Sequence, residues 1–177
     1  MAPSPVPTSL LRDEFDESPW YGYVALQSAQ LVVLHRVSDR YGLDGYCAFR
    51  REDVSQLTQD FDRSDLISRA IRLKTQTPAV PRGVDASSIQ NLMESVEREY
   101  GVMVINRERI APNDVEVGTV RMSTGQSYVL RWLGTDASWS PDDRTFKYAD
   151  VTHVEFGGEY ETTLLQVARE RERASDA

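Results

Sequence analysis

The fold of this chain is decided by the stretch Gly22-Tyr-Val-Ala-Leu-Gln-Ser-Ala-Gln-Leu-Val-Val-Leu34, which recurs 96 residues later as Gly118-Thr-Val-Arg-Met-Ser-Thr-Gly-Gln-Ser-Tyr-Val-Leu130. A self-similarity with a fixed spacing indicates a repeated structural unit. Short β-branched and aromatic runs on either side of a turn are typical of β-hairpins. The sequence therefore predicts two copies of one β-rich unit. Five positions are identical at this offset: Gly22/Gly118, Val24/Val120, Gln30/Gln126, Val33/Val129 and Leu34/Leu130.

A second pair of matching segments extends the repeat. After a loop that is one residue longer in the second copy, Phe49-Arg-Arg-Glu-Asp-Val-Ser-Gln-Leu57 corresponds to Phe146-Lys-Tyr-Ala-Asp-Val-Thr-His-Val154. Two copies of a short-stranded unit favour a duplicated small barrel over one large enzyme core. We expect a mainly β protein with a few helices (α+β), built as two tandem small barrels related by internal duplication.

Helical patterns accompany both β blocks. In the first copy, Ser64 is placed to cap a short helix. Asp85 is placed as the N-cap of the clearest helix, which we expect to bridge the two barrels, and Gly101 is placed to end it. A final helix is expected after Gly157. The apolar positions of the bridging helix lie on one face: Ile89, Leu92, Met93, Val96 and Tyr100.

The composition predicts where the units begin and end. Residues 1–8 hold three prolines and are expected to form a loosely attached arm. The following Ser9–Asp16 segment is compatible with a short helix or with the first strand of the first unit. The predicted organisation is an N-terminal arm (1–17), a first barrel with a trailing helix (18–73), a linker (74–84), a second barrel with leading and trailing helices (85–172) and a tail (173–177).

The charge balance bears on possible partners. The 177 residues include 28 acidic and 20 basic side chains, which give a net charge of −8 at pH 7. Nonspecific binding of nucleic acids depends on lysine and arginine that neutralise phosphates, so nucleic acid is a disfavoured but open partner. The single Cys47 excludes an intrachain disulfide and a multi-cysteine zinc site. With no secretory signal and no long apolar stretch, we expect a cytoplasmic protein that does not engage a membrane.

The order of the predicted elements is similar to that of Sm-like and SH3-like barrels. Arg50-Arg51-Glu52-Asp53-Val54 resembles the basic-Gly-acidic-Asn-hydrophobic signature of Sm proteins, although it lacks the glycine. The segment Ser38–Tyr46 has no Asn for the Sm base-binding pocket. The resemblance covers roughly residues 18–72 and 85–170 and implies the fold, while RNA binding is not carried over with it.

A second resemblance concerns small bacterial proteins of unknown function. It rests on Leu43-Asp-Gly-Tyr46, on Arg50–Val54 and on Asp150-Val-Thr-His-Val-Glu-Phe-Gly-Gly-Glu-Tyr160. This resemblance implies an uncharacterised family with two small β-barrel units. It implies no activity.

Residues able to carry chemistry are few. His35 and His153, the only imidazoles, follow or separate apolar strand residues, so we expect both to point away from the valines toward solvent or a partner. Cys47 lies within a strand and is interpreted as a small buried hydrophobic residue. We assign no catalytic residue, no metal ligand and no cofactor. The paired carboxylates are expected to be ordinary solvated groups: Asp13/Glu14, Asp16/Glu17, Asp142/Asp143 and Glu159/Glu161.

Aromatic side chains are the remaining candidates for binding. Phe49 and Phe146 occupy matching places in the two copies, which suggests that they are core residues. Tyr41, Tyr46 and Trp132 lack such a counterpart and are therefore the better candidates for exposed binding residues. Aromatic side chains on small barrels can stack on bases or on proline-rich peptides.

These observations favour a non-catalytic interaction or assembly module. Open edge strands can pair with each other or with another chain. We therefore expect a protein partner or self-association. The alternatives are an RNA-binding Sm-like protein and a small enzyme of unknown reaction in which Asp44 or His35 would act.

Overall fold

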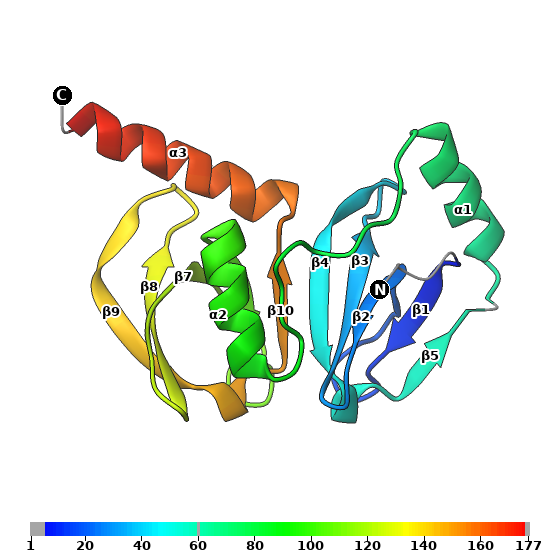
Figure 1. Ribbon diagram of the computed structural model, residues 1–177, viewed down its shortest axis with the longest axis horizontal. Coiled ribbons are helices and arrows are strands. Elements are labelled where there is room, and N and C mark those ends of the chain that lie inside the picture. The colour runs from blue at the N-terminus through cyan, green and yellow to red at the C-terminus, as the bar shows by residue number, and fades with distance from the viewer. Residues whose placement is uncertain (1–5, 60, 176–177) are drawn as a thin grey trace.

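The computed structural model describes residues 6–59 and 61–175 and shows a mainly β protein with three α-helices (Figure 1). Ten strands form one antiparallel sheet in the order β5-β1-β2-β3-β4-β10-β6-β7-β8-β9. The strands are β1 (Thr8–Leu11), β2 (Trp20–Gln27), β3 (Leu31–Val37), β4 (Leu43–Arg50), β5 (Gln56–Thr58), β6 (Met103–Asn106), β7 (Val115–Ser123), β8 (Ser127–Leu133), β9 (Trp139–Lys147) and β10 (His153–Phe156). The helices are α1 (Ser64–Leu73), α2 (Ile89–Tyr100) and α3 (Glu159–Ser175), with short 3-10 turns at Arg51–Asp53 and Tyr148–Asp150.

The expectation of two separately closed barrels needs correction, because the sheet is continuous and open. Each half of the sheet curves strongly, as Figure 1 shows, and the two halves meet where β4 pairs with β10. An edge strand leaves a row of backbone N–H and C=O groups without partners. Pairing one edge of each half satisfies these groups, and it joins the halves by hydrogen bonds.

Strand pairing follows the same register in the two halves. Gly22 lies opposite Arg36 in the β2–β3 hairpin, and Gly118 lies opposite Trp132 in the β7–β8 hairpin. Both hairpins contain a register shift at the same place, between Val24 and Leu26 in the first and between Val120 and Met122 in the second. The predicted hairpins around the two turns are therefore confirmed.

Close backbone contacts explain why both matching positions are occupied by glycine. A Cβ atom at Gly22 would lie 2.6 Å from the carbonyl oxygen of His35 and 3.0 Å from the Cβ of Leu34. A Cβ atom at Gly118 would collide in the same way with the carbonyl oxygen of Arg131. Neither backbone can move without disturbing the hairpin, so only glycine fits at either position.

Helix α2 ends as predicted but begins with a different cap. Ser88 is the N-cap, and its Oγ accepts a hydrogen bond of 3.1 Å from the Asn91 N–H. Asp85, predicted as the cap, instead accepts a hydrogen bond of 2.9 Å from the Ser87 N–H in the preceding turn. Gly101 adopts the left-handed conformation with φ 76° and closes the helix. In α1, Ser64 is the first helical residue and not the N-cap.

The largest apolar cluster spans both halves. Leu31 and Val33 of β3 contribute to it together with Leu92 and Val96 of α2 and Phe156 of β10. Helix α2 therefore packs against a shared core, while strand pairing makes the direct junction. Helix α3 covers a second cluster through Leu164, Leu165 and Ala168, and α1 covers another through Ile67 and Ile71.

The N-terminal segment belongs in part to the sheet. Thr8–Leu11, which the predicted boundaries place in the arm, forms β1 and lies between β2 and β5. Of the two alternatives for this region, the strand is observed. The first five residues of the predicted arm and the last two of the predicted tail lie outside the described residues. None of the helices within the described residues has the length and apolar character that crossing a bilayer requires.

Candidate functional site

The two outermost strands of the sheet, β5 and β9, present open edges. All three residues of β5 are exposed, as are residues 142–145 of β9. In the paired strand β4, by contrast, Cys47 is 1 % exposed, and Ala48 and Phe49 are fully buried. Among the described residues, the sheet therefore offers its free backbone groups at β5 and β9.

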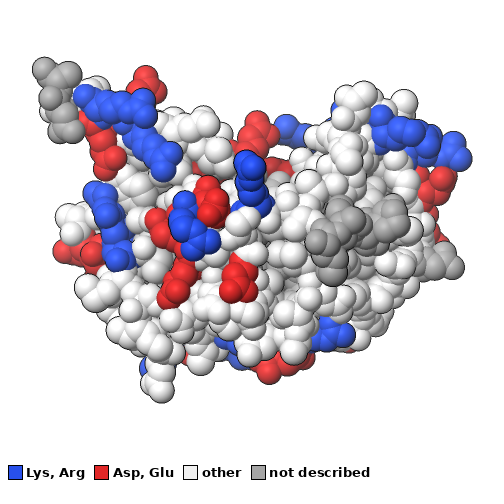
Figure 2. Space-filling model, in the orientation of Figure 1, with Lys and Arg blue, Asp and Glu red and all other residues white. Residues whose placement is uncertain are grey.

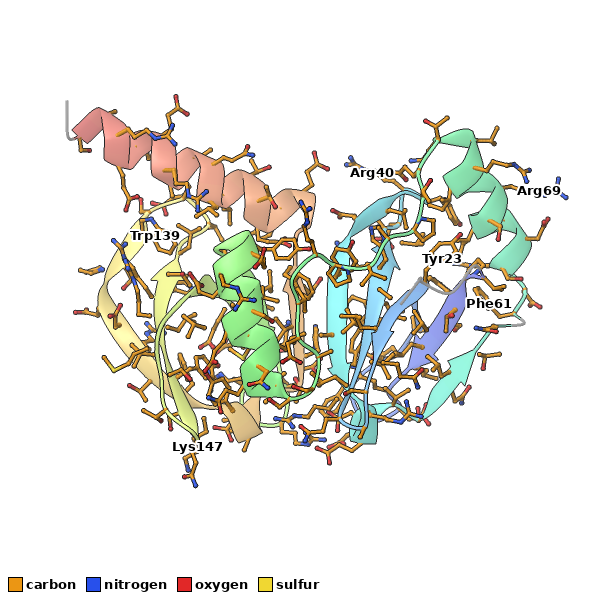
Figure 3. All side chains as sticks on the ribbon, in the orientation of Figure 1. Tyr23, Arg40, Phe61, Arg69, Trp139 and Lys147 are labelled. Carbon is orange, nitrogen blue, oxygen red and sulfur yellow. The ribbon has the colours of Figure 1, made fainter. Side chains whose placement is uncertain are left out.

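Polar side chains line the open edge of β9. Pro141 lies near its start, and Asp143, Arg144 and Lys147 follow along the strand. Figure 3 shows Lys147 projecting away from the sheet at one end of the strand. Charged residues and proline on an edge strand limit uncontrolled pairing between sheets.

A chain of ionic contacts passes through the junction between the two halves. Its first member is Arg12, which follows β1 and has a fully buried side chain. The Arg12 guanidinium donates to Asp16 at 2.7 Å and to Glu108 at 2.8 Å, and it lies over the Phe49 ring at 5.0 Å. This cation therefore ties the N-terminal segment to the second half of the chain.

His153 continues this chain of contacts from β10. Its Nδ1 lies 3.2 Å from a carboxylate oxygen of Glu108, and its Nε2 lies 3.7 Å from Glu155. Burial lowers the pKa of His153, but hydrogen bonds to Glu108 and Glu155 outweigh it and leave the pKa raised. The expectation that His153 points toward solvent or a partner is wrong, because Trp20 and Phe49 cover that face of β10.

Glu155 links this group to the first half of the sheet. Its carboxylate accepts a hydrogen bond of 2.7 Å from Arg36, which also donates to Asp44 at 2.9 Å. Cys47 is buried as predicted, and its thiol lies 3.7 Å from Glu155. Burial and the nearby carboxylate raise the pKa of Cys47, so the thiol stays protonated and is a weak nucleophile.

His35 lies apart from these contacts. Its ring stacks on Tyr46 at a centroid distance of 4.5 Å, and its Nδ1 accepts a hydrogen bond of 3.0 Å from the Ala79 N–H. An accepting Nδ1 carries no proton, and burial lowers the pKa of His35 to about 4. His35 thus anchors the linker to the sheet, which is a structural role.

This arrangement predicts a pH-dependent contribution to stability. Because the pKa of His35 is lower in the folded chain than the ordinary value of 6.5, its contribution is present above pH 6.5 and is lost as the pH falls to about 4. In urea titrations across this range, the variant His35→Gln should show a flatter pH dependence than the parent. The difference in slope should be at most about 1.4 kcal/mol per pH unit, and equal slopes would contradict the assignment.

A wide cleft of about 1280 Å³ lies between α1, the β3–β4 connection and the start of α3. Figure 2 shows the surface hollowed along its upper edge between these helices. Figure 3 shows Arg40 where β3 turns into β4, beside this hollow. The lining includes the aromatic side chains Trp20, Tyr21, Tyr41 and Tyr160, the cations Arg36, Arg40, Arg63 and Lys74, and the carboxylates Asp39, Asp44 and Glu159.

The structure separates the three aromatic binding candidates. Tyr41 lines the cleft. Tyr46 is partly buried between His35 and the Phe156 ring, where its centroid lies 5.3 Å from that of Phe156. Trp132 is 36 % exposed on β8, in the other half of the sheet. The cleft therefore includes only one of the three.

The paired carboxylates do not converge on a reaction centre. Glu161 accepts a hydrogen bond of 2.5 Å from the Gly158 N–H at the start of α3, which is a capping contact. Burial raises the pKa of Glu161. Glu161 is therefore not the ordinary solvated carboxylate that the sequence predicts. No group of three or more His, Cys, Asp or Glu side chains within residues 6–59 and 61–175 could hold a metal ion.

Sequence reasoning missed the buried ionic contacts and the cleft. Arg12 and Glu108 are 96 residues apart, and nothing in the sequence around Glu108 distinguishes it from an exposed charge. The one available signal was the arginine within an otherwise apolar strand end, Leu10-Leu11-Arg12.

Comparisons with protein-family models, with curated proteins and with solved structures find no match for this chain.

Proposed function

We propose that this protein is a non-catalytic assembly module, in which two copies of an Sm-like or SH3-like unit offer open sheet edges to a further copy of the chain. The observation that carries the proposal is the junction between β4 and β10. It joins the fourth strand of the first unit to the last strand of the second unit. The unpaired edges are the last strand of the first unit, β5, and the fourth strand of the second unit, β9.

The internal junction supplies a template for contact between chains. Ala48 lies opposite Val154 there, with Phe49 opposite His153. In the sequence repeat, Thr145 corresponds to Ala48, and Leu57 corresponds to Val154. The same pairing between two chains would place Thr145 of one copy opposite Leu57 of the next.

The composition of these edges favours a reversible contact. Thr145 and Leu57 are exposed, and the charged residues Asp143, Arg144 and Lys147 lie within two positions of Thr145 on β9. Backbone hydrogen bonds would supply most of the contact, as in other cases of strand addition. Because the two surfaces differ, the association runs head to tail, and it forms rings if the rotation closes and filaments if it does not.

Disulfide cross-linking tests this register directly. Leu57→Cys and Thr145→Cys, combined in a Cys47→Ala background, should give covalent oligomers on mild oxidation, seen as a ladder on a non-reducing gel. Opposed residues of an antiparallel pair lie close enough for a disulfide. Light scattering of the parent chain should show a molar mass that rises with concentration.

A matched control places the second cysteine away from the edge. Met122 on β7 is 63 % exposed but does not belong to either outer strand, so Leu57→Cys with Met122→Cys should give no ladder. Equal cross-linking in both double variants would contradict the register. A parent chain that remains monomeric at all concentrations would contradict self-assembly itself.

A further inference from the structure

The cleft between α1 and α3 is lined by several cations that have no salt bridge to any carboxylate of the described residues. Arg36 in the cleft wall pairs with Asp44 at 2.9 Å. Arg40, Arg63 and Lys74 also line the cleft, and among the described residues none of them forms a salt bridge. Asp39 and Glu159 line the cleft as well, so its wall holds four cations and three carboxylates and carries a small excess of positive charge in a chain whose net charge is −8.

Aromatic rings accompany these cations. Arg63 lies over the Tyr21 ring at 5.8 Å, and Tyr21 in turn stacks on Phe61. Tyr160, at the start of α3, is 53 % exposed at the opposite wall. The cleft therefore combines positive charge with apolar ring faces.

The corresponding corner of the second half is closed. The turn Gly134–Ser138 has the same hydrogen bonds as Ser38–Gly42: Ala137 N–H donates to Gly134 and Tyr41 N–H donates to Ser38, at 2.9 and 2.8 Å. Ala137 is 4 % exposed and packs in one cluster with Leu164, Leu165 and Ala168 of α3. The turn is thus buried under α3 in the second half, whereas in the first half Tyr41 is only partly buried beside the α1 cluster and lines the cleft.

The central residues of the two turns differ in charge and in size. Where helix α3 covers the turn, the positions are Asp136 and Ala137, and in the open cleft they are Arg40 and Tyr41. Tyr41 holds the left-handed conformation, with φ 55°. Ala137, at the matching position, has φ 59°, so the turn takes this conformation in both halves and only the first half places a bulky aromatic side chain there.

We infer that this cleft binds a peptide segment in which acidic side chains alternate with apolar ones. Arg40, Arg63 and Lys74 would pair with the carboxylates, and Tyr21 and Tyr41 would contact the apolar side chains. The volume of about 1280 Å³ exceeds that of a typical small-molecule pocket and suits an extended segment of chain. The site shares no residue with β5 or β9, so the inference is independent of the proposed assembly.

Fluorescence polarisation with a labelled peptide of alternating glutamate and leucine tests the inference on the full chain. We expect this peptide to bind, and analogues with glutamine or lysine in place of glutamate to bind at least about tenfold more weakly, because charge complementarity decides specificity at such a surface. The double variant Arg40→Asp with Lys74→Glu should also lose about tenfold in affinity.

Two further variants separate binding from folding. Arg173→Asp changes a charge near the far end of α3, outside the cleft, and should leave peptide affinity unchanged. Tyr41→Ala introduces the residue found at the matching turn position and should weaken binding while the chain remains folded, as judged by its urea midpoint. Failure of the glutamate–leucine peptide to bind, equal affinity for the double variant, or equal affinity for the lysine analogue would each overturn the inference.

Discussion

Replacement of Arg12 by alanine is expected to lower the free energy of unfolding by about 3–5 kcal/mol, because it leaves buried partners without their counter-charge. The Arg12 side chain is fully buried, and its guanidinium bonds Asp16 and Glu108. The Glu108 carboxylate would then keep the His153 ring, 3.2 Å away, but would lose its guanidinium partner. Urea unfolding followed by tryptophan fluorescence at pH 7 measures the loss.

An exposed ion pair provides the control for Arg12. Arg69 and Asp65 form an i,i+4 pair on α1 at 2.8 Å, and both side chains are more than 60 % exposed. Arg69→Ala should lower the free energy of unfolding by less than about 0.5 kcal/mol, as is usual for solvated ion pairs. A loss below about 1 kcal/mol in Arg12→Ala would show that the junction does not depend on this cation.

Replacement of Gly45 by alanine is the second change expected to have a large effect. Gly45 has φ +63°, and a Cβ atom there would collide with the backbone nitrogen of Gly158 and lie 2.7 Å from the Phe156 carbonyl oxygen. Alanine at this position would strain the left-handed backbone and overpack against neighbouring backbone atoms. The free energy of unfolding should therefore fall by about 2–4 kcal/mol. Because the collision lies between the two halves, it should weaken their junction directly.

Gly125 is the matched control for Gly45. It lies in the β7–β8 turn, and a Cβ atom there would meet no heavy atom within 4 Å. Gly125→Ala should therefore change the free energy of unfolding by less than about 0.5 kcal/mol. Similar urea midpoints for the two alanine variants would contradict the close approach of the halves at Gly45.

Much of the local structure could be predicted from the sequence. The hairpin around Ser28 and its partner around Thr124 were predictable because glycine spacing and strand periodicity are local signals. The same holds for α2, whose apolar face and terminal Gly101 belong to one short window. The cap at Ser88 was missed because Asp85 and Ser88 are both good capping residues, and the geometry of the turn decides between them.

The environment of the central strands could not be predicted in the same way. Alternation along β10 correctly places His153 and Val154 on opposite faces. It does not show what covers each face, because Trp20 and Arg12 come from distant parts of the chain. For the same reason, Tyr46 was a binding candidate although it lies stacked between His35 and Phe156.

By itself, the amino-acid sequence determined the mainly β class, the hairpins and the positions of the helices, since these depend on neighbours a few residues apart. Tertiary structure alone decided that the halves share one open sheet through β4 and β10, that Arg12 and His153 are buried between them, and that a cleft opens beside Tyr41. Each of these features depends on contacts between residues far apart in the chain. Such contacts follow from how the assembled elements pack, and no local pattern encodes them.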